Sequence, residues 1–155
     1  MKIDVNCCIY NEKGKKLEVN DIIKKVQEMD KSEVVYTSVD IINQENDGYE
    51  LQCNSQINAK GNIYFIFDRQ ELLYVGKSLN IKQRLCQHLI KCPKSTYSKI
   101  QEVHQYLIKN GISKLSYCTI DVNPDCYYGL IEGMIIKYIH KNKQNFPNNW
   151  NLRED

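Results

Sequence analysis

The sequence lacks the features that mark membrane proteins, secreted proteins and zinc ribbons. Its longest unbroken apolar run covers residues 63–67, whereas a membrane-spanning helix needs about 18 apolar residues. The seven cysteines are an odd number and no pair has C-x-x-C spacing, which removes the main support for a disulfide framework or a zinc ribbon. Asp4 stands where the apolar stretch of a signal peptide would begin. We therefore expect a cytoplasmic chain with reduced thiols and no membrane partner.

The chain also lacks an excess of charge of either sign. Its 155 residues carry 21 Lys and Arg against 19 Asp and Glu, a net charge of +2. Global charge therefore gives no argument for a nucleic-acid partner, which must rest on a local patch. Residues 72–101 contain no Asp or Glu, and their basic residues are Lys77, Lys82, Arg84, Lys91, Lys94 and Lys99. Contacts of this kind with phosphates would make DNA binding strongly salt-dependent.

The N-terminal third predicts a small α/β unit. Residues 7–10 and 17–19 flank a polar turn and predict a strand pair, and Asn20 can cap a helix that ends near Met29. Residues 34–42 are rich in Val, Ile, Thr and Tyr and predict a strand. The polar stretch 43–48 is the best candidate for a boundary. We interpret residues 1–58 as an N-terminal α/β extension of unknown role and residues 59–155 as the main domain.

The main domain predicts an α+β fold in which helices cover a small sheet. Apolar patterns predict strands over 63–67, 72–75 and 115–122, the first two joined as a hairpin. Helical spacing predicts three helices, the first capped by Asn80 and continuing to Cys92, the others over about 97–110 and 127–140.

Two polar residues share one face of the helix that follows the hairpin. Arg84 and His88 are four positions apart, which places their side chains on the same side. A guanidinium offers paired donors to phosphate oxygens, and an imidazole can move a proton. Taken alone, such a pair is better explained as part of a solvated helix face, because polar pairs at this spacing are common on surface helices.

Glu132 falls on the apolar face of the helix predicted over 127–140. At about 100° per residue it lies between Ile136 and Ile139 and close to Ile135. A buried ionised carboxylate costs several kcal/mol unless it is paired, protonated or bound to a metal. Two explanations stay open: an edge position or salt bridge to a nearby Lys, or a ligand for a hard cation such as Mg²⁺, which usually takes one or two protein carboxylates.

Two tripeptides that each contain a tyrosine lie on the two predicted strands of the hairpin, and several polar residues follow the second of them. They are Asn62-Ile63-Tyr64 and Tyr74-Val75-Gly76, followed by Lys77, Ser78, Asn80, Arg84 and His88, and much later by the helical Glu132. This pattern resembles the GIY-YIG nuclease family over about residues 61–151. The sequence departs from the first family motif at Asn62, where the family has Gly, although Gly61 lies directly before it.

The resemblance implies a small three-stranded antiparallel sheet flanked by helices, which agrees with the strands and helices predicted above. It also implies hydrolysis of a DNA phosphodiester through one divalent metal ion, Mg²⁺ or Mn²⁺. In this scheme Glu132 would hold the ion against the scissile phosphate. Arg84 would face the extra negative charge of the transition state.

The resemblance assigns the remaining site residues as hypotheses. Tyr64, helped by Lys77 or His88, would take the proton from the attacking water, which requires cationic neighbours that lower a phenol pKa from about 10. Tyr74 would hydrogen-bond the water or the phosphate. A site asparagine near the end of the module is also implied, and residues 147–151 offer two registers, of which we favour Asn151 over Asn149.

Two other functions stay open. A catalytically inactive module could use the same fold to hold nucleic acid, although the presence of Tyr64, Tyr74, Arg84, His88 and Glu132 argues against it. The second is a small-molecule or RNA-directed hydrolase, because DNA is indicated by the resemblance and the lysines rather than by a base-reading motif. The sequence does not indicate the oligomeric state or the DNA sequence that would be cut.

Overall fold

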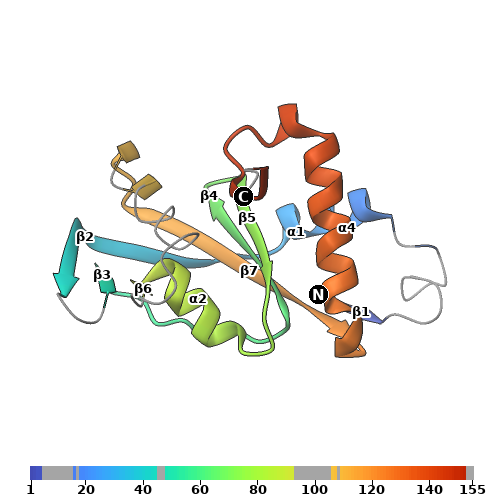
Figure 1. Cartoon of the computed structure of the whole chain (residues 1–155), viewed down its shortest axis with the longest axis horizontal. Helices are drawn as coiled ribbons and strands as arrows, with labels where there is room; N and C mark the ends of the chain where they lie inside the picture. The colour runs from blue at the N-terminus through green and yellow to red at the C-terminus, as the bar shows by residue number, and fades with distance from the viewer. Residues whose placement is uncertain (5–15, 17, 45–47, 93–105, 108, 153–155) are drawn as a thin grey trace.

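The computed structural model describes residues 1–4, 16, 18–44, 48–92, 106–107 and 109–152 (Figure 1). In this part of the chain the strands form one seven-stranded sheet in the order β5-β4-β7-β2-β3-β6, with β1 also beside β7. The strands are β1 (Lys2–Asp4), β2 (Ser32–Gln44), β3 (Gly48–Cys53), β4 (Ile63–Asp68), β5 (Glu71–Lys77), β6 (Lys91–Cys92) and β7 (Lys114–Asn123). The helices that lie wholly within the described residues are α1 (Val19–Glu28), α2 (Ile81–Leu89), α4 (Tyr128–Lys141) and the 3₁₀ turns η2 (Asp125–Tyr127), η3 (Lys143–Asn145) and η4 (Trp150–Leu152).

The three antiparallel strands predicted from the sequence form one end of this sheet. β4 pairs with β5 on one side, where Tyr64 lies opposite Gly76, and with β7 on the other. The α+β class is confirmed, but the prediction of only three strands is wrong. β2 and β1 both pair with the far edge of β7, so the sheet continues into the N-terminal third. The hydropathy pattern did not predict these pairings, because it indicates that a segment forms a strand but not which strand it pairs with.

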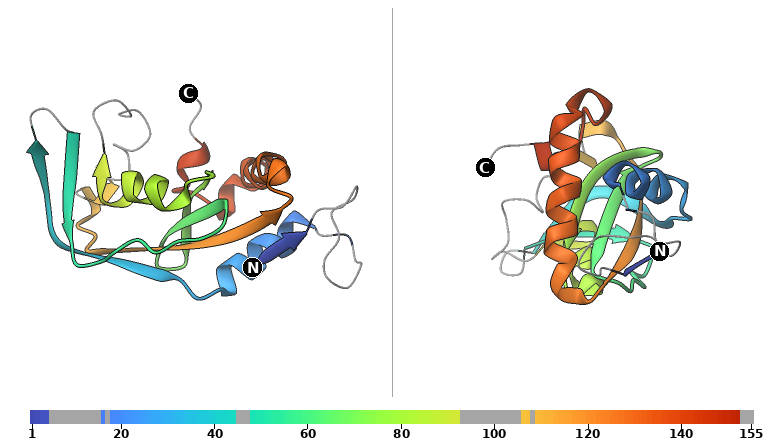
Figure 2. Two further views of the ribbon diagram at one scale, coloured as in Figure 1. Left: turned by 90° about the horizontal axis from the view of Figure 1, so that it is seen from below. Right: turned by 90° about the vertical axis from the view of Figure 1, so that its right-hand side faces the viewer.

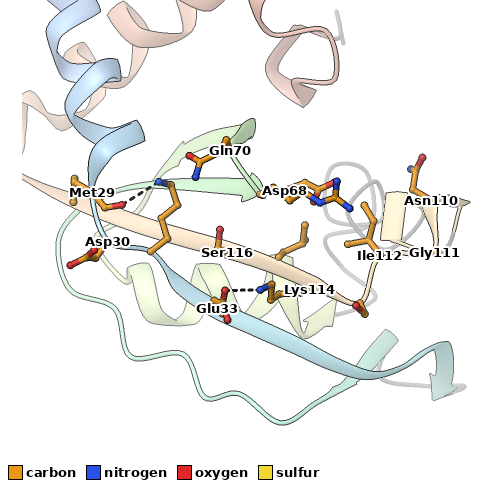
Figure 3. A pocket seen from close by; sticks show the side chains of 14 residues that line it. Met29, Asp30, Glu33, Asp68, Gln70, Asn110, Gly111, Ile112, Lys114 and Ser116 are labelled. Atoms are coloured by element: carbon orange, nitrogen blue, oxygen red, sulfur yellow. Dashed lines mark hydrogen bonds and ion pairs between the residues drawn. The ribbon is translucent and has the colours of Figure 1, made fainter.

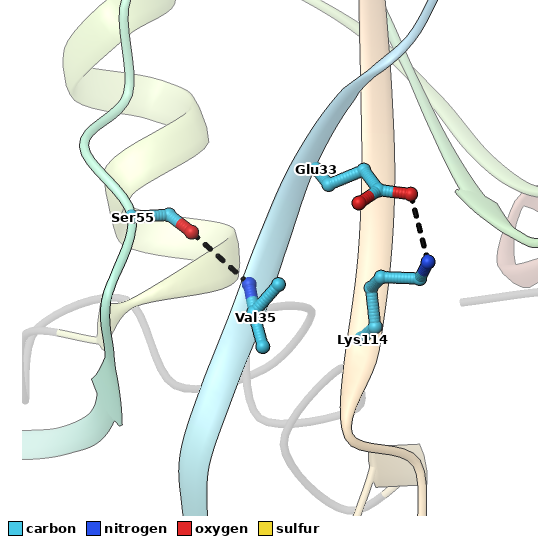
Figure 4. Close-up of polar contacts among 4 residues, drawn as sticks. All are labelled: Glu33, Val35, Ser55 and Lys114. Atoms are coloured by element: carbon cyan, nitrogen blue, oxygen red, sulfur yellow. Dashed lines mark hydrogen bonds and ion pairs between the residues drawn. The ribbon is translucent and has the colours of Figure 1, made fainter.

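β2 joins the two halves of the sheet through its backbone and its side chains. Val34 lies opposite Leu115 of β7, and the Val35 amide donates to Ser55 Oγ at 3.1 Å on the other side. Lys114 Nζ lies 2.8 Å from Glu33 Oε1 across the β2–β7 pair (Figure 4). From Tyr36 onward the strand pairs with β3, and the described residues of the candidate boundary, Asn43, Gln44 and Gly48, belong to this pair. Residues 45–47 lie outside the described residues. The division at residue 58 stays a prediction.

Helices cover both faces of the central strands (Figure 2). Ile63, Phe65 and Phe67 of β4 pack in one core with α1 and α4, whereas Tyr64 and Ile66 point into a second core with α2. All five side chains are at most 1% exposed. This two-sided burial is the physical reason for the continuous apolar run, because a strand open to water on one face would alternate with polar residues.

The helix boundaries follow the predictions closely, with three corrections. Asn80 caps α2 by accepting from the Gln83 amide at 3.3 Å, as predicted. α2 ends at Leu89, however, because Cys92 belongs to β6 and pairs with β3. α1 begins at Val19, which was predicted as strand, and Asn20 does not cap it. The Asn20 carboxamide instead accepts from the Tyr138 hydroxyl at 3.0 Å, a tertiary contact that displaces the local capping role.

Two predicted elements lie outside the described residues in whole or in large part. These are the strand segment over 7–10 and most of the helix over 97–110, of which residues 106–107 and 109–110 are described and helical. Among the helices that the structure does place, none has the length and apolar character needed to cross a bilayer.

Asn62 explains the departure from the family motif. Its carboxamide donates to Val122 O and accepts from Val122 N, both at 2.9 Å, so the side chain pairs with β7 as a strand residue would. Gly61 directly before it has φ +109, and a Cβ there would lie 2.6 Å from Ile120 O. Glycine is therefore required at position 61, where the backbone approaches β7 too closely for a side chain.

Candidate active site

Tyr64 lies at the centre of a buried polar cluster between β4 and α2. Its ring is 1% exposed, and its hydroxyl lies 2.8 Å from Nε2 of His88, which is also 1% exposed. The ring covers Gly76 on the neighbouring strand, where a Cβ would lie 2.4 Å from the Tyr64 hydroxyl. The glycine of the second tripeptide therefore makes room for the tyrosine of the first.

Tyr74 completes an aromatic triad with these two residues. The Tyr74 ring lies 6.0 Å from that of Tyr64 and 5.1 Å from that of His88, and the Tyr64 and His88 rings are 5.6 Å apart. These separations are typical of stabilising aromatic contacts. Trp150 packs on Tyr74 from the C-terminal side at 6.2 Å. The sequence did not indicate this contact, because the two residues lie far apart in the chain.

Arg84 reaches the same cluster from α2. Its guanidinium lies near enough to the Tyr64 hydroxyl to lower that group's pKa, and its Nη1 donates to Gln87 Oε1 at 3.2 Å. Arg84 and His88 thus both contact Tyr64, which confirms that they share one helix face. The Asn80 cap sets the start of α2 one turn before Arg84 and so fixes which residues face β4.

The environment of Tyr64 does not suit a phenolate. Burial raises the pKa of the Tyr64 hydroxyl well above its usual value, Tyr74 raises it further, and Arg84 lowers it by less than these two raise it. The hypothesis that cationic neighbours lower this pKa toward neutrality is therefore not supported. Tyr64 keeps its proton near neutral pH and acts as a neutral hydrogen-bonding group.

Lys77 and Glu132 form a second group at the end of β5. Lys77 Nζ lies 2.9 Å from Glu132 Oε2, and the side chains are 42% and 15% exposed. The hydrogen bond to Glu132 is the largest cause that raises the pKa of Lys77 above its usual value. The lysine extends over the first turn of α4, where its Nζ would lie 3.3 Å from a Cβ at Gly129.

The Lys77–Glu132 ion pair corresponds to one of the two explanations that the sequence left open for Glu132. Ile131, Ile135 and Ile139 of α4 are buried in the core, and Glu132 lies at the border of that face with a lysine as its partner. The salt-bridge explanation is thus observed. The described contacts place Glu132 with Lys77 rather than with the Tyr64 cluster, and β5 connects the two groups, because Gly76 and Lys77 are consecutive.

The two candidate site asparagines, Asn149 and Asn151, connect the C-terminal segment to β5 through hydrogen bonds. The Asn151 carboxamide accepts from Val75 N at 2.8 Å and donates to Val75 O at 2.9 Å. Asn149 donates to Leu72 O at 3.1 Å and accepts from the Asn151 amide at 2.8 Å. Both carboxamides are therefore engaged by backbone groups, and Asn151 is bonded to Val75, the residue that follows Tyr74.

The residues around Glu132 fit a magnesium ion that is bound mainly by water and substrate. No group of three His, Cys, Asp or Glu side chains occurs among the residues that the structure describes, so the site offers one carboxylate. Mg²⁺ typically keeps several waters and uses one or two carboxylates together with substrate phosphates. With an ion bound to the Glu132 carboxylate, Lys77 would either keep its contact with that carboxylate or lose it.

A groove of about 600 Å³ lies elsewhere, between the end of α1, the β4–β5 turn and the start of β7 (Figure 3). Acidic and basic side chains alternate around it, and two of them, Glu33 and Lys114, already form an ion pair. None of the site residues predicted from the sequence lines this groove. The site residues predicted from the sequence therefore lie at the Tyr64 cluster and the end of β5, away from this groove.

One family model matches part of this chain. The family model described as the GIY-YIG catalytic domain matches residues 60–125, which confirms the resemblance drawn from the sequence. The matched segment contains Tyr64, Tyr74, Lys77, Arg84 and His88 and ends before α4. Searches of curated proteins and of solved structures gave no match.

Proposed function

We propose that this protein is a metal-dependent DNA endonuclease that hydrolyses phosphodiester bonds with a single divalent ion. The observation that carries the proposal is the buried contact between the Tyr64 hydroxyl and His88 Nε2, to which Arg84 adds a cation. A phenol, an imidazole and a guanidinium in one cluster can orient a water, accept a proton and bind a phosphate oxygen. Members of the matched family are generally endonucleases.

Arg84 is the group best suited to the phosphate. Its side chain is half-buried and is oriented by Gln87 and Tyr64, so little reorganisation is needed when charge develops on the phosphate. A preorganised cation of this kind contributes several kcal/mol to transition-state stabilisation.

His88 is the proton acceptor in this scheme and Tyr64 is its neutral partner. An imidazole exchanges protons near neutral pH, whereas the buried Tyr64 phenol does not. The Tyr64 hydroxyl lies 2.8 Å from His88 Nε2, so it can donate its own proton to the imidazole as it takes up the proton of the attacking water, and it remains neutral. Tyr74, beside both rings, holds the water or phosphate in place.

Glu132 is the residue that would hold the divalent ion, Mg²⁺ or Mn²⁺, and a bound ion supplies Lewis-acid stabilisation of charge on the phosphate. Lys77 holds the Glu132 carboxylate in one orientation. It also brings a positive charge to the end of β5, one residue beyond Gly76. Asn151 positions Val75 and thereby the strand that carries both Tyr74 and Lys77.

DNA as substrate is supported by the local charge. Lys77, Lys82 and Lys91 are exposed, and the acid-free segment 72–101 includes Arg84. Lys94 and Lys99 lie outside the described residues. A cytoplasmic location belongs to the same proposal, since it follows from the expectation of reduced thiols.

Plasmid nicking with Mg²⁺ or Mn²⁺, with and without a chelator, tests the proposal. We expect cleavage that requires the ion, and loss of at least about 100-fold in rate for Arg84→Ala and Glu132→Ala, whose circular dichroism should match the wild type. Lys114→Ala is the control, because it removes a charge from an exposed ion pair remote from the site. Wild-type rates in either site variant would refute the assigned roles.

The inactive binding module is the alternative function. It predicts salt-dependent binding without cleavage of duplex, branched or single-stranded DNA under any of these conditions. A small-molecule or RNA-directed hydrolase predicts turnover of those substrates but not of DNA. The same protein preparation, assayed on the three classes in parallel, distinguishes these outcomes.

A further inference from the structure

The C-terminal segment, residues 146–152, passes along the edge of β5 from one core to the other. Phe146 packs in the core that contains α4, and Trp150 packs in the core that contains α2; each is 6% exposed. Between and beside them, Asn149 and Asn151 are hydrogen-bonded to β5. Figure 1 shows the segment after the end of α4 and next to β5, and its last turn, η4, contacts both elements.

Trp150, the only tryptophan of the chain, contacts two tyrosines. Its ring lies 6.2 Å from that of Tyr74 and 5.6 Å from that of Tyr106. Tyr74 in turn lies 5.1 Å from the ring of His88. Because protein interiors are close-packed, a buried indole on one side of Tyr74 limits the orientations that the phenol ring can take. The position of the C-terminal segment therefore affects how Tyr74 faces the rest of the cluster.

His140 connects this segment to α4. Its Nε2 lies 2.8 Å from Asn151 O, and because a carbonyl oxygen only accepts hydrogen bonds, Nε2 carries the proton and donates it. His140 lies in the last turn of α4, about two turns beyond Glu132 on the same helix. One hydrogen bond thus joins the helix that carries the candidate metal ligand to the segment that packs on Tyr74.

The same hydrogen bond connects β5 to α4. Asn151 accepts from His140 through its backbone, and its carboxamide bonds to both the N–H and the C=O of Val75. Val75 follows Tyr74, and two residues further on Lys77 forms an ion pair with α4. The part of β5 that carries Tyr74 is therefore linked to α4 at two places. The ion pair is partly exposed and contributes little by itself, so the link through His140 is the more constraining of the two.

We infer that His140 is a positioning residue of the proposed nuclease site: it holds the C-terminal segment in place, so that Trp150 keeps Tyr74 in its orientation. This inference rests on the proposed function and adds a residue to its site. His140 transfers no proton in this role and acts only through Asn151 and Trp150. A contact that served stability alone would lower the free energy of unfolding without a specific loss of turnover.

Plasmid nicking with Mg²⁺ over a range of DNA concentrations provides the first test. His140→Leu removes the donor, and we expect kcat to fall about tenfold while KM for DNA stays within about twofold, because Tyr74 is displaced and Arg84 is not. His140→Gln should recover most of the lost kcat, because its amide can donate to the same carbonyl. Asn142→Ala is the matched control and should leave kcat unchanged. It removes another 2.8 Å hydrogen bond at the same end of α4, made to Tyr138 O within the helix.

The fluorescence of Trp150 provides the second test, which needs neither DNA nor metal. Since Trp150 is buried, acrylamide should quench it weakly in the wild type, His140→Gln and Asn142→Ala. His140→Leu should be quenched at least about twofold more strongly, because the C-terminal segment opens locally. His140→Asn, whose shorter side chain does not reach the carbonyl, takes the place of His140→Leu if the circular dichroism of the latter departs from the wild type.

The two tests separate this inference from the proposed function. If the quenching of Trp150 depends on His140 but the wild type never cuts DNA, the contact between His140 and the C-terminal segment is supported and the proposed hydrolysis fails. If the wild type cuts DNA, three results would each overturn the inference: unchanged quenching in His140→Leu, no recovery of kcat in His140→Gln, or an equal loss of kcat in Asn142→Ala.

Discussion

The Tyr64 ring fills the space above Gly76 in which any other residue would place its Cβ. The two residues are opposite each other in the β4–β5 pair, and a Cβ at Gly76 would lie 2.4 Å from the Tyr64 hydroxyl and 2.9 Å from the Tyr74 ring. The two tyrosine tripeptides are therefore one packing unit. Because Gly76 has no side chain, the Tyr64 ring can pack over it with its hydroxyl next to His88 and Arg84.

Gly76→Ala should displace Tyr64 and damage both stability and activity. Because the Cβ meets a buried ring on a sheet, we expect an overpacking cost of about 1–3 kcal/mol in the free energy of unfolding. Cleavage should fall further than stability, because the Tyr64–His88 contact is lost. Urea denaturation and the nicking assay measure the two effects.

Gly133→Ala is the control for that substitution. Gly133 is exposed within α4 and a Cβ there meets nothing within 4 Å. Replacing a helical glycine with alanine should therefore stabilise the protein by about 0.5–1 kcal/mol and leave cleavage unchanged. Equal behaviour of the two glycine variants would contradict the packing account.

Asn151→Ala should loosen the C-terminal segment from β5. The substitution leaves the N–H and C=O of Val75, which is fully buried, without their partners, at an expected cost of about 1–3 kcal/mol. If Asn151 acts only by positioning, KM and kcat should change while the affinity for Mg²⁺ stays the same. Asn148→Ala, which removes one exposed hydrogen bond to Glu71, should alter stability by less than about 0.5 kcal/mol. A large loss of metal affinity in Asn151→Ala would instead indicate a ligand.

The Lys77–Glu132 pair should contribute modestly to stability. A double-mutant cycle with Lys77→Met and Glu132→Gln should give a coupling of about 0.5–1 kcal/mol, because the lysine is 42% exposed and solvent screens the pair. The Lys114–Glu33 pair, with both side chains about half exposed, should give less. Both couplings should shrink in high salt. A coupling of several kcal/mol would mean that the pair is a structural element rather than an accessible site.

The raised pKa of Tyr64 predicts a specific dependence on alkaline pH. The folded chain keeps this proton at pH values where the unfolded chain, with a phenol pKa of about 10, releases it. The folded state therefore binds more protons above pH 10, and the free energy of unfolding decreases as pH rises through this range. Tyr64→Phe should reduce this slope, measured by urea denaturation at pH 9, 10 and 11. A slope identical to that of the wild type would show that Tyr64 ionises normally in the folded protein.

The pH dependence of the cleavage rate distinguishes His88 from Tyr64 as the proton acceptor. If His88 accepts the proton, Tyr64→Phe should lower the whole pH–rate profile without changing its shape between pH 7 and 10. If Tyr64 were a phenolate base, the wild-type rate would rise through this range and the variant would lose that rise.

The sequence by itself determined the local framework of the site. Hairpin spacing and helix periodicity predicted that the two tyrosine tripeptides lie on paired strands and that Arg84 and His88 share one face of a helix. That these side chains meet in one cluster was implied only by the family resemblance. The Asn80 cap and the strands near 63–67, 72–75 and 115–122 were likewise predictable from local patterns.

Only the tertiary structure decided what depends on long-range contacts. It placed β2 and β1 on the far edge of β7, paired Glu132 with Lys77, and engaged Asn151 and Asn149 with β5. It also reversed the expected pKa shift of Tyr64, because burial between the sheet and α2 outweighs the nearby Arg84. These outcomes depend on which surfaces exclude water when the layers pack, and residue spacing carries no information about that.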